Sequence, residues 1–195
     1  MIAARNRPPA TFGGKPIRRT GRAERGQPAS PDAVRASCRF DAKQQKLVDF
    51  LLPDLQGNPV RFRDLDADLI LIDFWGTWCE PCLHAIPHLV ELQDRFGPQQ
   101  LRVVGIAYEQ GPASGRASSV AATMRRFGIN YPVLLGPSDG SCPLQEALHV
   151  QAYPTLILVD RHGRIRWRDQ GATPTTLARL DRVVAAATRA DVVRR

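Results

Sequence analysis

Residues 69–82 read LILIDFWGTWCEPC. The first seven of these residues are apolar except for Asp73, and such a run is typical of a strand buried on both faces of a parallel or mixed sheet. A short loop follows, and from residue 80 to residue 96 apolar side chains recur at helical spacing until Gly97-Pro98 interrupts them. The stretch therefore predicts a buried strand, a loop and a helix that begins at a pair of cysteines.

The rest of the chain continues this alternation of strands and helices. Apolar runs predict further strands, and helical periodicity bounded by Gly or Pro predicts further helices. The expected strands are 47–52, 55–62, 101–108, 131–135, 155–160 and 165–169, and the expected helices are 117–127, 143–149 and 174–188. This order indicates an α/β fold in which helices flank a mixed central sheet, with an N-terminal β-hairpin.

Positive charge is concentrated in the first quarter of the chain. The 195 residues carry a net charge of +8, and residues 1–46 hold eleven Lys or Arg against three Asp or Glu, whereas the remainder is neutral. Residues 1–45 are also rich in Arg, Pro, Gly and Ser and lack apolar periodicity. We therefore predict a disordered basic extension over 1–45 and one folded domain over 46–190. Because this domain has no excess of positive charge, we expect no nucleic-acid partner.

The sequence shows no membrane span and no export signal. It contains no apolar run of the roughly 18 residues that a transmembrane helix needs. The arginines near the N-terminus are followed by polar residues and not by the apolar core of a signal peptide. The compartment would be cytoplasmic if the printed start is the natural one.

The spacing of Cys79 and Cys82 predicts a redox-active pair. A helix N-terminus stabilises an anion, so a cysteine there has its pKa lowered from about 8.5 to roughly 3.5–7.5. The thiolate is the species that attacks a disulfide. Two intervening residues bring the second sulfur back to the first helical turn, where Pro81 is tolerated because its missing N–H would have no partner. Cys79 is therefore the predicted nucleophile and Cys82 the resolving thiol.

A metal site is the main alternative for these cysteines. Zinc sites need a second pair of Cys or His ligands at suitable spacing. His84 and His88 lie four residues apart on the same predicted helix, but no second Cys-x-x-Cys exists. Haem attachment would need a His directly after Cys82, where Leu83 stands. We therefore expect neither a metal nor a cofactor.

Several motifs around the cysteine pair resemble those of the thioredoxin superfamily. Residues 70–75 and the Trp78-Cys79 dipeptide resemble the strand and active-site entry of thioredoxin, and Pro87 resembles the proline of its active-site helix. Residues 153–155, Tyr-Pro-Thr, resemble its cis-proline segment, and residues 171–172, Gly-Ala, precede the last helix in a similar way. The resemblance implies a thioredoxin-like fold.

Within that superfamily, the sequence is more similar to the TlpA/ResA branch than to thioredoxin itself. The likeness rests on the Glu80-Pro81 dipeptide, on a segment at about 110–150 that is similar to that branch's insertion, and on residues 53–57, PDLQG, which are similar to its N-terminal hairpin. The resemblance covers residues 47–190. It implies a thiol–disulfide oxidoreductase of the periplasm, although the visible N-terminus supplies no signal peptide.

The resemblance also implies roles for residues outside the cysteine pair. Pro154 would be the cis-proline that faces Cys79, and Tyr153 would line the substrate groove; the alternative is a trans proline that opens a strand. Asp73 is expected to act as the base for Cys82, with a raised pKa because a buried carboxylate is costly. The alternative for Asp73 is an ordinary strand residue hydrogen-bonded to a neighbouring loop.

Four further residues complete the expectations. Glu109 stands where ResA-like proteins carry a Glu that can tune the pKa of the cysteines; the alternative is a solvated loop acid. Trp78 is expected to pack over the cysteines and to contact a partner, with plain core packing as its alternative. Cys142 precedes a predicted helix start, which could lower its pKa, and we interpret it as a passive thiol. Cys38 is expected to lie in the extension, outside the fold.

These features together predict a monomeric enzyme that carries out dithiol–disulfide exchange with a protein partner. We expect it to act as a reductase and not as an oxidant. Cys79 would attack the partner's disulfide, Cys82 would release the reduced partner, and an upstream dithiol reductant would recharge the pair. One alternative is a peroxiredoxin-like peroxidase, in which a single cysteine follows a Pro-x-x-x-Thr pattern. The other is a Sco-type copper carrier, in which three residues separate the cysteines and a distant His is used.

Overall fold

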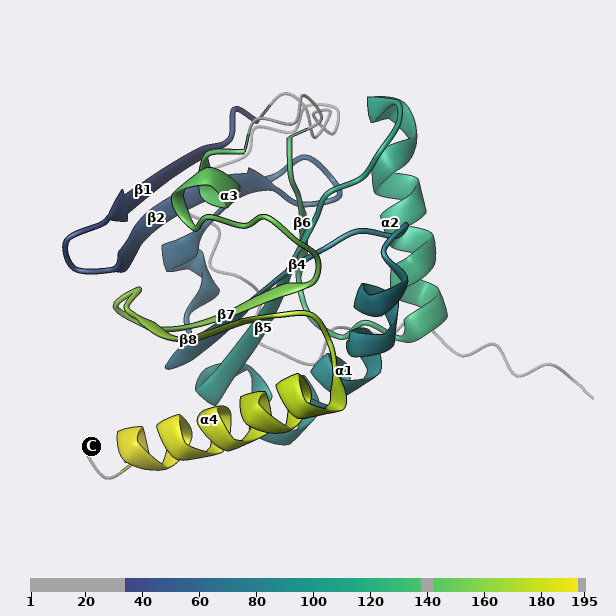
Figure 1. The fold of residues 1–195 in the computed structure, drawn as a ribbon. Helices are drawn as coiled ribbons and strands as arrows, with labels where there is room; N and C mark the ends of the chain where they lie inside the picture. Colours follow the sequence, from purple (N-terminus) through teal and green to yellow (C-terminus); the bar gives the residue numbers. More distant parts are fainter. Residues whose placement is uncertain (1–33, 138–141, 193–195) are drawn as a thin grey trace, which may run out of the picture.

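The computed structural model describes residues 34–137 and 142–192 (Figure 1). These residues form a five-stranded central sheet, a separate three-stranded sheet near the N-terminus, and helices that cover the central sheet. The predicted α/β architecture with a mixed sheet is confirmed. None of the described helices combines the length and the apolar character that crossing a membrane requires.

The central sheet is built around β4 (Leu69–Trp75), the strand that the apolar run predicts. The strand order is β6-β5-β4-β7-β8, so β4 lies in the middle, parallel to β5 and antiparallel to β7. The other four strands are β5 (Leu101–Ala107), β6 (Val133–Leu135), β7 (Thr155–Asp160) and β8 (Ile165–Gln170). Every residue of β4 and β5 is buried, which explains why their sequences are apolar except for Asp73 and Arg102 and do not alternate.

The two faces of β4 pack into different cores, because successive side chains of a strand point to opposite faces. One core lies under the helices and receives Leu69, Leu71 and Trp75. The other lies under the N-terminal sheet and receives Ile70, Ile72 and Phe74. Asp73 occupies the same alternating series as Leu71 and Trp75, so its side chain projects toward the helical side.

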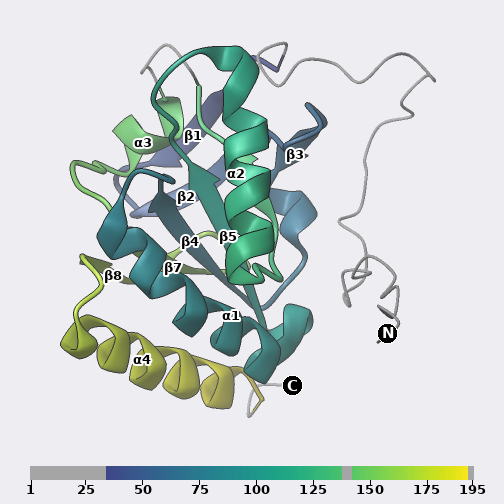
Figure 2. The ribbon, with the colours of Figure 1, turned by 90° about the vertical axis from the view of Figure 1, so that its right-hand side faces the viewer.

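Helices α1 (Glu80–Gln100) and α4 (Pro174–Val192) lie side by side on one face of the central sheet (Figure 2). Helix α2 (Ala113–Phe127) contributes Val120 to the same core. The N-terminal sheet and the short helix α3 (Pro143–Ala147) cover the opposite face, so the molecule has three layers.

The helix boundaries differ from the predicted ones at the least apolar turns. Helix α2 begins four residues before its predicted start. The first turn lacks an apolar period, so the sequence pattern did not indicate it. Helix α4 continues four residues past the predicted end. Gly97 interrupts α1 with a φ of 68°, as predicted, but a last helical segment follows it to Gln100.

The N-terminal sheet contains the predicted hairpin and one strand that was not predicted. The hairpin pairs β2 (Lys46–Pro53) with β3 (Pro59–Arg61), which leads into the 3-10 helix η2 (Phe62–Leu65). The additional strand is β1 (Ser37–Asp41), antiparallel to β2. The expected extension over 1–45 is therefore wrong at its C-terminal end, because residues 37–41 pair with β2 and pack Cys38 and Phe40 against the core. Residues 1–33 lie outside the described part of the chain.

A close backbone contact joins this sheet to the turn between β7 and β8. Gly163 accepts a hydrogen bond of 2.8 Å from Leu47 N, and a Cβ on Gly163 would collide with the Leu47 carbonyl. Gly163 also has a φ of 80°, a conformation that favours glycine. The glycine therefore allows the N-terminal sheet to sit against the central one.

Candidate active site

The structure brings Cys79 and Cys82 together as a disulfide at the start of α1. Cys79 is the N-cap residue and has an extended backbone, and its Sγ lies 3.3 Å from the amide N of Cys82, which donates to it. Cys79 N also donates to Gly76 O at 3.1 Å, which closes the loop that leads out of β4. Cys79 is 5% exposed and Cys82 is fully buried. Cys79 is therefore the more accessible residue of the pair, and it lies at the positive end of the helix.

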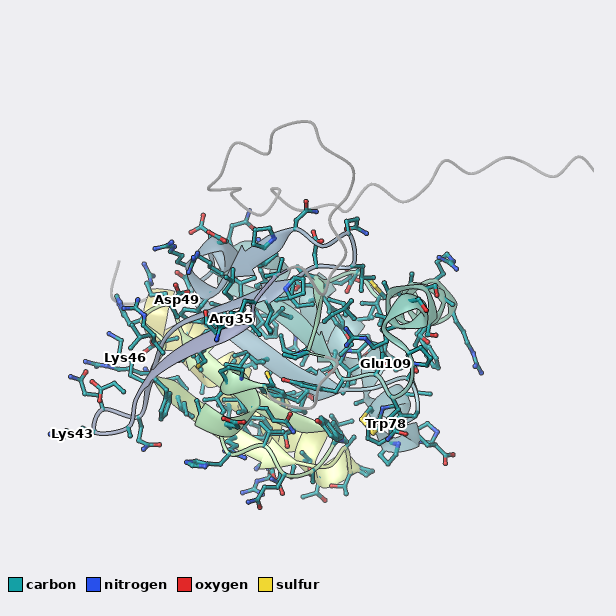
Figure 3. All side chains as sticks on the ribbon, turned by 90° about the horizontal axis from the view of Figure 1, so that it is seen from above. Arg35, Lys43, Lys46, Asp49, Trp78 and Glu109 are labelled. Carbon is teal, nitrogen blue, oxygen red and sulfur yellow. A yellow bond between two sulfur atoms is a disulfide. The ribbon has the colours of Figure 1, made fainter. Side chains whose placement is uncertain are left out.

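Glu109 holds the loop that precedes the cysteines. Its Oε1 accepts a hydrogen bond of 2.8 Å from Thr77 N, and its Oε2 accepts one of 2.6 Å from Thr77 Oγ1. Figure 3 places Glu109 and Trp78 on the same side of the molecule, next to the yellow disulfide. The carboxylate thus reaches the loop two residues before Cys79, and an influence on the pKa of the cysteines stays a prediction.

Trp78 is the large apolar side chain next to the disulfide, and it is 46% exposed. Its Nε1 donates a hydrogen bond of 2.8 Å to Tyr108 O, and its ring meets the ring of Tyr153 edge-on, with centroids 5.5 Å apart. A Cβ on Gly76 would lie 2.5 Å from Trp78 Nε1, so a glycine is needed for the indole to lie over the loop. Plain core packing, the alternative for Trp78, does not describe this side chain. Pro81 lies in the first turn of α1 and is exposed.

The Tyr153–Pro154 peptide bond is cis, as the resemblance implied. Pro154 directly precedes β7, whose Thr155 pairs with Phe74 near the end of β4. The proline therefore lies at the edge of the sheet from which the cysteine loop emerges. Tyr153 is half-buried, and its hydroxyl accepts a hydrogen bond of 3.0 Å from Gln145 Nε2.

Asp73 is buried without a hydrogen-bond partner. It is 1% exposed, and neither carboxylate oxygen accepts a hydrogen bond from any residue that the structure describes. Burial raises the pKa of Asp73 to about 8, because the charged form loses its solvation. The alternative reading, a carboxylate bonded to a neighbouring loop, does not fit this environment. The side chain lies on the sheet face that α1 covers, in the same core as Cys82.

Sequence reasoning missed two tyrosines at the site. Tyr131 is buried in the same core, and the pKa of its hydroxyl is raised by burial and by the charge of the nearby Asp73. Tyr108 supplies the carbonyl that holds Trp78. The position of Tyr108 carries a usable signal, since it directly follows β5 and the carboxyl ends of parallel strands meet at one edge of a sheet. No comparable signal points to Tyr131.

The two remaining cysteines lie in the core under the N-terminal sheet. Cys142 is the N-cap of α3 and is buried, and burial raises its pKa although backbone hydrogen bonds from Leu144 and Gln145 act in the opposite direction. Cys38 belongs to β1 and packs against the same core, which corrects the expectation that it lies outside the fold. Burial, the charge of Cys142 and that of Asp49 raise the pKa of Cys38 to about 12.

The described residues contain no group of three or more His, Cys, Asp or Glu side chains placed to hold a metal ion. His84 is exposed on α1, and His88 Nε2 lies 3.1 Å from Asp181 Oδ1 on α4. Neither histidine therefore joins the cysteine pair in a cluster within the described part of the chain.

Comparisons with known proteins agree with this geometry. Residues 44–168 match the model of the AhpC/TSA family. The thiol-disulfide oxidoreductase ResA of Halalkalibacterium halodurans is 27% identical over 121 residues, which cover 62% of this chain and 64% of that protein. ResA of Bacillus subtilis is 28% identical over 117 residues, covering 60% and 61%. The matched region thus spans a little under two thirds of the length of these relatives.

Solved structures show the same fold. A thiol:disulfide interchange protein of the thioredoxin family from Chlorobium tepidum superposes with a TM-score of 0.60 at 26% identity, covering 76% of this chain and 99% of that one. A secreted disulfide oxidoreductase of Mycobacterium tuberculosis, homologous to E. coli DsbE, superposes with a TM-score of 0.57 at 19% identity, covering 75% and 99%. Since the family model covers more than half of the sequence, this chain belongs to the AhpC/TSA family and has a thioredoxin-like fold.

Proposed function

We propose that this chain is a thiol–disulfide oxidoreductase that reduces disulfides in protein partners through Cys79 and Cys82. The observation that carries the proposal is the disulfide between an N-cap cysteine and a cysteine in the first turn of α1, beside an exposed Trp78. The names of the ResA relatives support the same reaction.

The reaction transfers two electrons in two exchange steps. In the reduced protein, the Cys79 thiolate attacks one sulfur of the partner's disulfide, and the other partner sulfur leaves as a thiolate. The Cys82 thiolate then attacks Cys79 Sγ and displaces the second partner thiolate. The partner gains two electrons and two protons, and the chain is left with the disulfide seen here. An upstream dithiol then reduces the Cys79–Cys82 disulfide by the same two exchange steps and is itself oxidised to a disulfide.

Asp73 would accept the proton of Cys82 in the second step. A base is most effective when its pKa lies near the working pH, and burial brings the pKa of Asp73 to about 8. The carboxyl faces the core that contains Cys82, where water is excluded and another proton acceptor is needed.

The other predicted residues would position the partner and the loop. Glu109 would keep the loop in place through its two hydrogen bonds to Thr77, and its negative charge would raise the pKa of a nearby thiol. Trp78 and Tyr153 would contact the partner, and the backbone next to Pro154 would pair with an extended partner segment.

Reduction of insulin by a thiol reductant tests the proposal. We expect Cys79→Ser to abolish catalysed reduction, and Cys82→Ser to accumulate a mixed disulfide with insulin because the resolving thiol is missing. Cys38→Ser is the matched control, since this cysteine packs against the core under the N-terminal sheet and not the core that contains Cys79 and Cys82, and it should leave the rate unchanged. Undiminished activity of Cys79→Ser contradicts the assignment of the nucleophile.

The same preparations separate the two alternative functions. Hydrogen peroxide consumption that is faster than insulin reduction and depends on Cys79 would indicate a peroxidase. One tightly held copper per chain after gentle purification would indicate a copper carrier. Either result would overturn the proposed reductase.

A further inference from the structure

The core under the N-terminal sheet contains two thiols that the proposed reaction does not use. Cys38 lies on β1, and Cys38 and Phe40, together with Ala36 just before the strand, pack against this core. Cys142 lies in the same core as the N-cap of α3, and α3 packs against β1. About a hundred residues separate the two cysteines in the chain, yet the fold brings both to one place.

Tyr108 contacts one of these thiols directly and packs against the same core as the other. Its hydroxyl donates a hydrogen bond to Cys142 Sγ at 2.8 Å. Cys38, Cys142 and Tyr108 all pack in this one core. Burial raises the pKa of the Tyr108 hydroxyl, and the charges of Cys142 and Cys38 add to that effect. The pKa of Cys38 is raised mainly by burial and further by a charge on Cys142, in agreement with the core that the two residues share.

We propose that Cys38 and Cys142 are a second dithiol of this protein, able to close into an intramolecular disulfide that joins β1 to α3. Cys38 is half-buried on an edge strand and Cys142 is buried, so an external oxidant meets Cys38 first. This division of an accessible and an enclosed sulfur parallels that of Cys79 and Cys82, but the second pair has no helix-cap thiolate of low pKa. The second pair therefore reacts slowly.

Glutathione disulfide is a suitable oxidant, and the reaction balances. The Cys38 thiolate attacks one glutathione sulfur and displaces the other glutathione as a thiolate. The Cys142 thiolate then attacks Cys38 Sγ and displaces the second glutathione. The pair loses two electrons and two protons, and one glutathione disulfide becomes two glutathione thiols.

The test uses the double variant Cys79→Ser/Cys82→Ser, so its result does not depend on the proposed function. Reduced and pre-oxidised samples are equilibrated in glutathione buffers at about pH 8 until both give the same thiol content. Peptide mapping under non-reducing conditions, after the free thiols are blocked, then identifies the bonded cysteines. The same map of the wild-type protein excludes an effect of the two serines.

We expect a peptide that contains Cys38 linked to Cys142 in a monomer of unchanged size. We also expect the midpoint of thermal unfolding to rise on oxidation, because the new bond closes a long loop in the unfolded chain. The triple variant with Cys142→Ser, which keeps Cys38, should show neither effect. The proposal is wrong if both thiols stay free, if Cys38 carries glutathione beside a free Cys142, or if the only bond formed links two chains.

Discussion

Asp73 gives a prediction whose size follows from the structure, because this buried carboxyl weakens the fold as the pH rises. In the unfolded chain its pKa is the ordinary 3.8, and in the folded protein burial raises the pKa to about 8. Between these values the folded state keeps the proton and the unfolded state has lost it, so the free energy of unfolding falls with increasing pH. The penalty is absent below the lower value and constant above the higher one.

The magnitude can be worked from the shift. Each pH unit between the two pKa values changes the free energy of unfolding by about 1.4 kcal/mol, so the full shift of about four units amounts to roughly 6 kcal/mol. About 3 kcal/mol of it develops between about pH 5 and about pH 7. Asp73→Asn has a similar shape and does not titrate, so it lacks this slope. Any penalty for burying the Asn amide is independent of pH.

Urea unfolding of the oxidised proteins from about pH 5 to about pH 9 measures the effect. The advantage of Asp73→Asn over the wild type should grow by about 3 kcal/mol over the first two units and become constant above about pH 8. Tyr131→Phe is the matched control, because it changes the neighbouring side chain and keeps the carboxyl. It should retain the slope of the wild type. An advantage that stays the same at every pH would show that Asp73 is already ionised in the folded protein.

Substitutions at three further positions test the surroundings of the cysteines. Glu109→Ala removes both acceptors of Thr77 and should lower the free energy of unfolding by about 1–3 kcal/mol, measured by urea unfolding, with Glu109→Gln losing less because it keeps one acceptor. Gly136→Ala places a Cβ against the ring of Tyr108 and should destabilise the fold by about 1–3 kcal/mol; an unchanged thermal midpoint would contradict the packing. Trp78→Ala should slow the reduction of insulin more than that of a small disulfide, and equal losses would argue against contact with a protein partner.

The elements that the sequence predicted best are those with a local cause. β4 and β5 are buried on both faces, so their apolar runs are continuous and easily recognised. The start of α1 is marked by Cys79 and Pro81, whose positions at a helix N-terminus have a direct physical reason. The cis peptide before Pro154 came from the resemblance alone, because nothing in a single X-Pro dipeptide indicates the isomer.

The features that were missed depend on residues far apart in the chain. β1 is only five residues long, with Cys38 and Phe40 between polar residues, so its formation depends on pairing with β2. Cys38 and Cys142 share one core because α3 packs on β1, and no local pattern encodes this. Tyr131 lies just before β6, and its place beside Asp73 is set by the order of strands in the sheet.

The two contacts that hold the Trp78 indole in place have a consequence for the kind of surface that could bind this protein. The indole is half-exposed, yet one hydrogen bond and one aromatic neighbour already restrict its torsions. A side chain that is fixed beforehand avoids an ordering penalty of about 0.5–1.5 kcal/mol on complex formation. Such a side chain also cannot change its conformation to fit different partner surfaces. Binding would then favour partner proteins that have a flat apolar surface next to their own disulfide. Complexes that fit poorly would dissociate before exchange occurs.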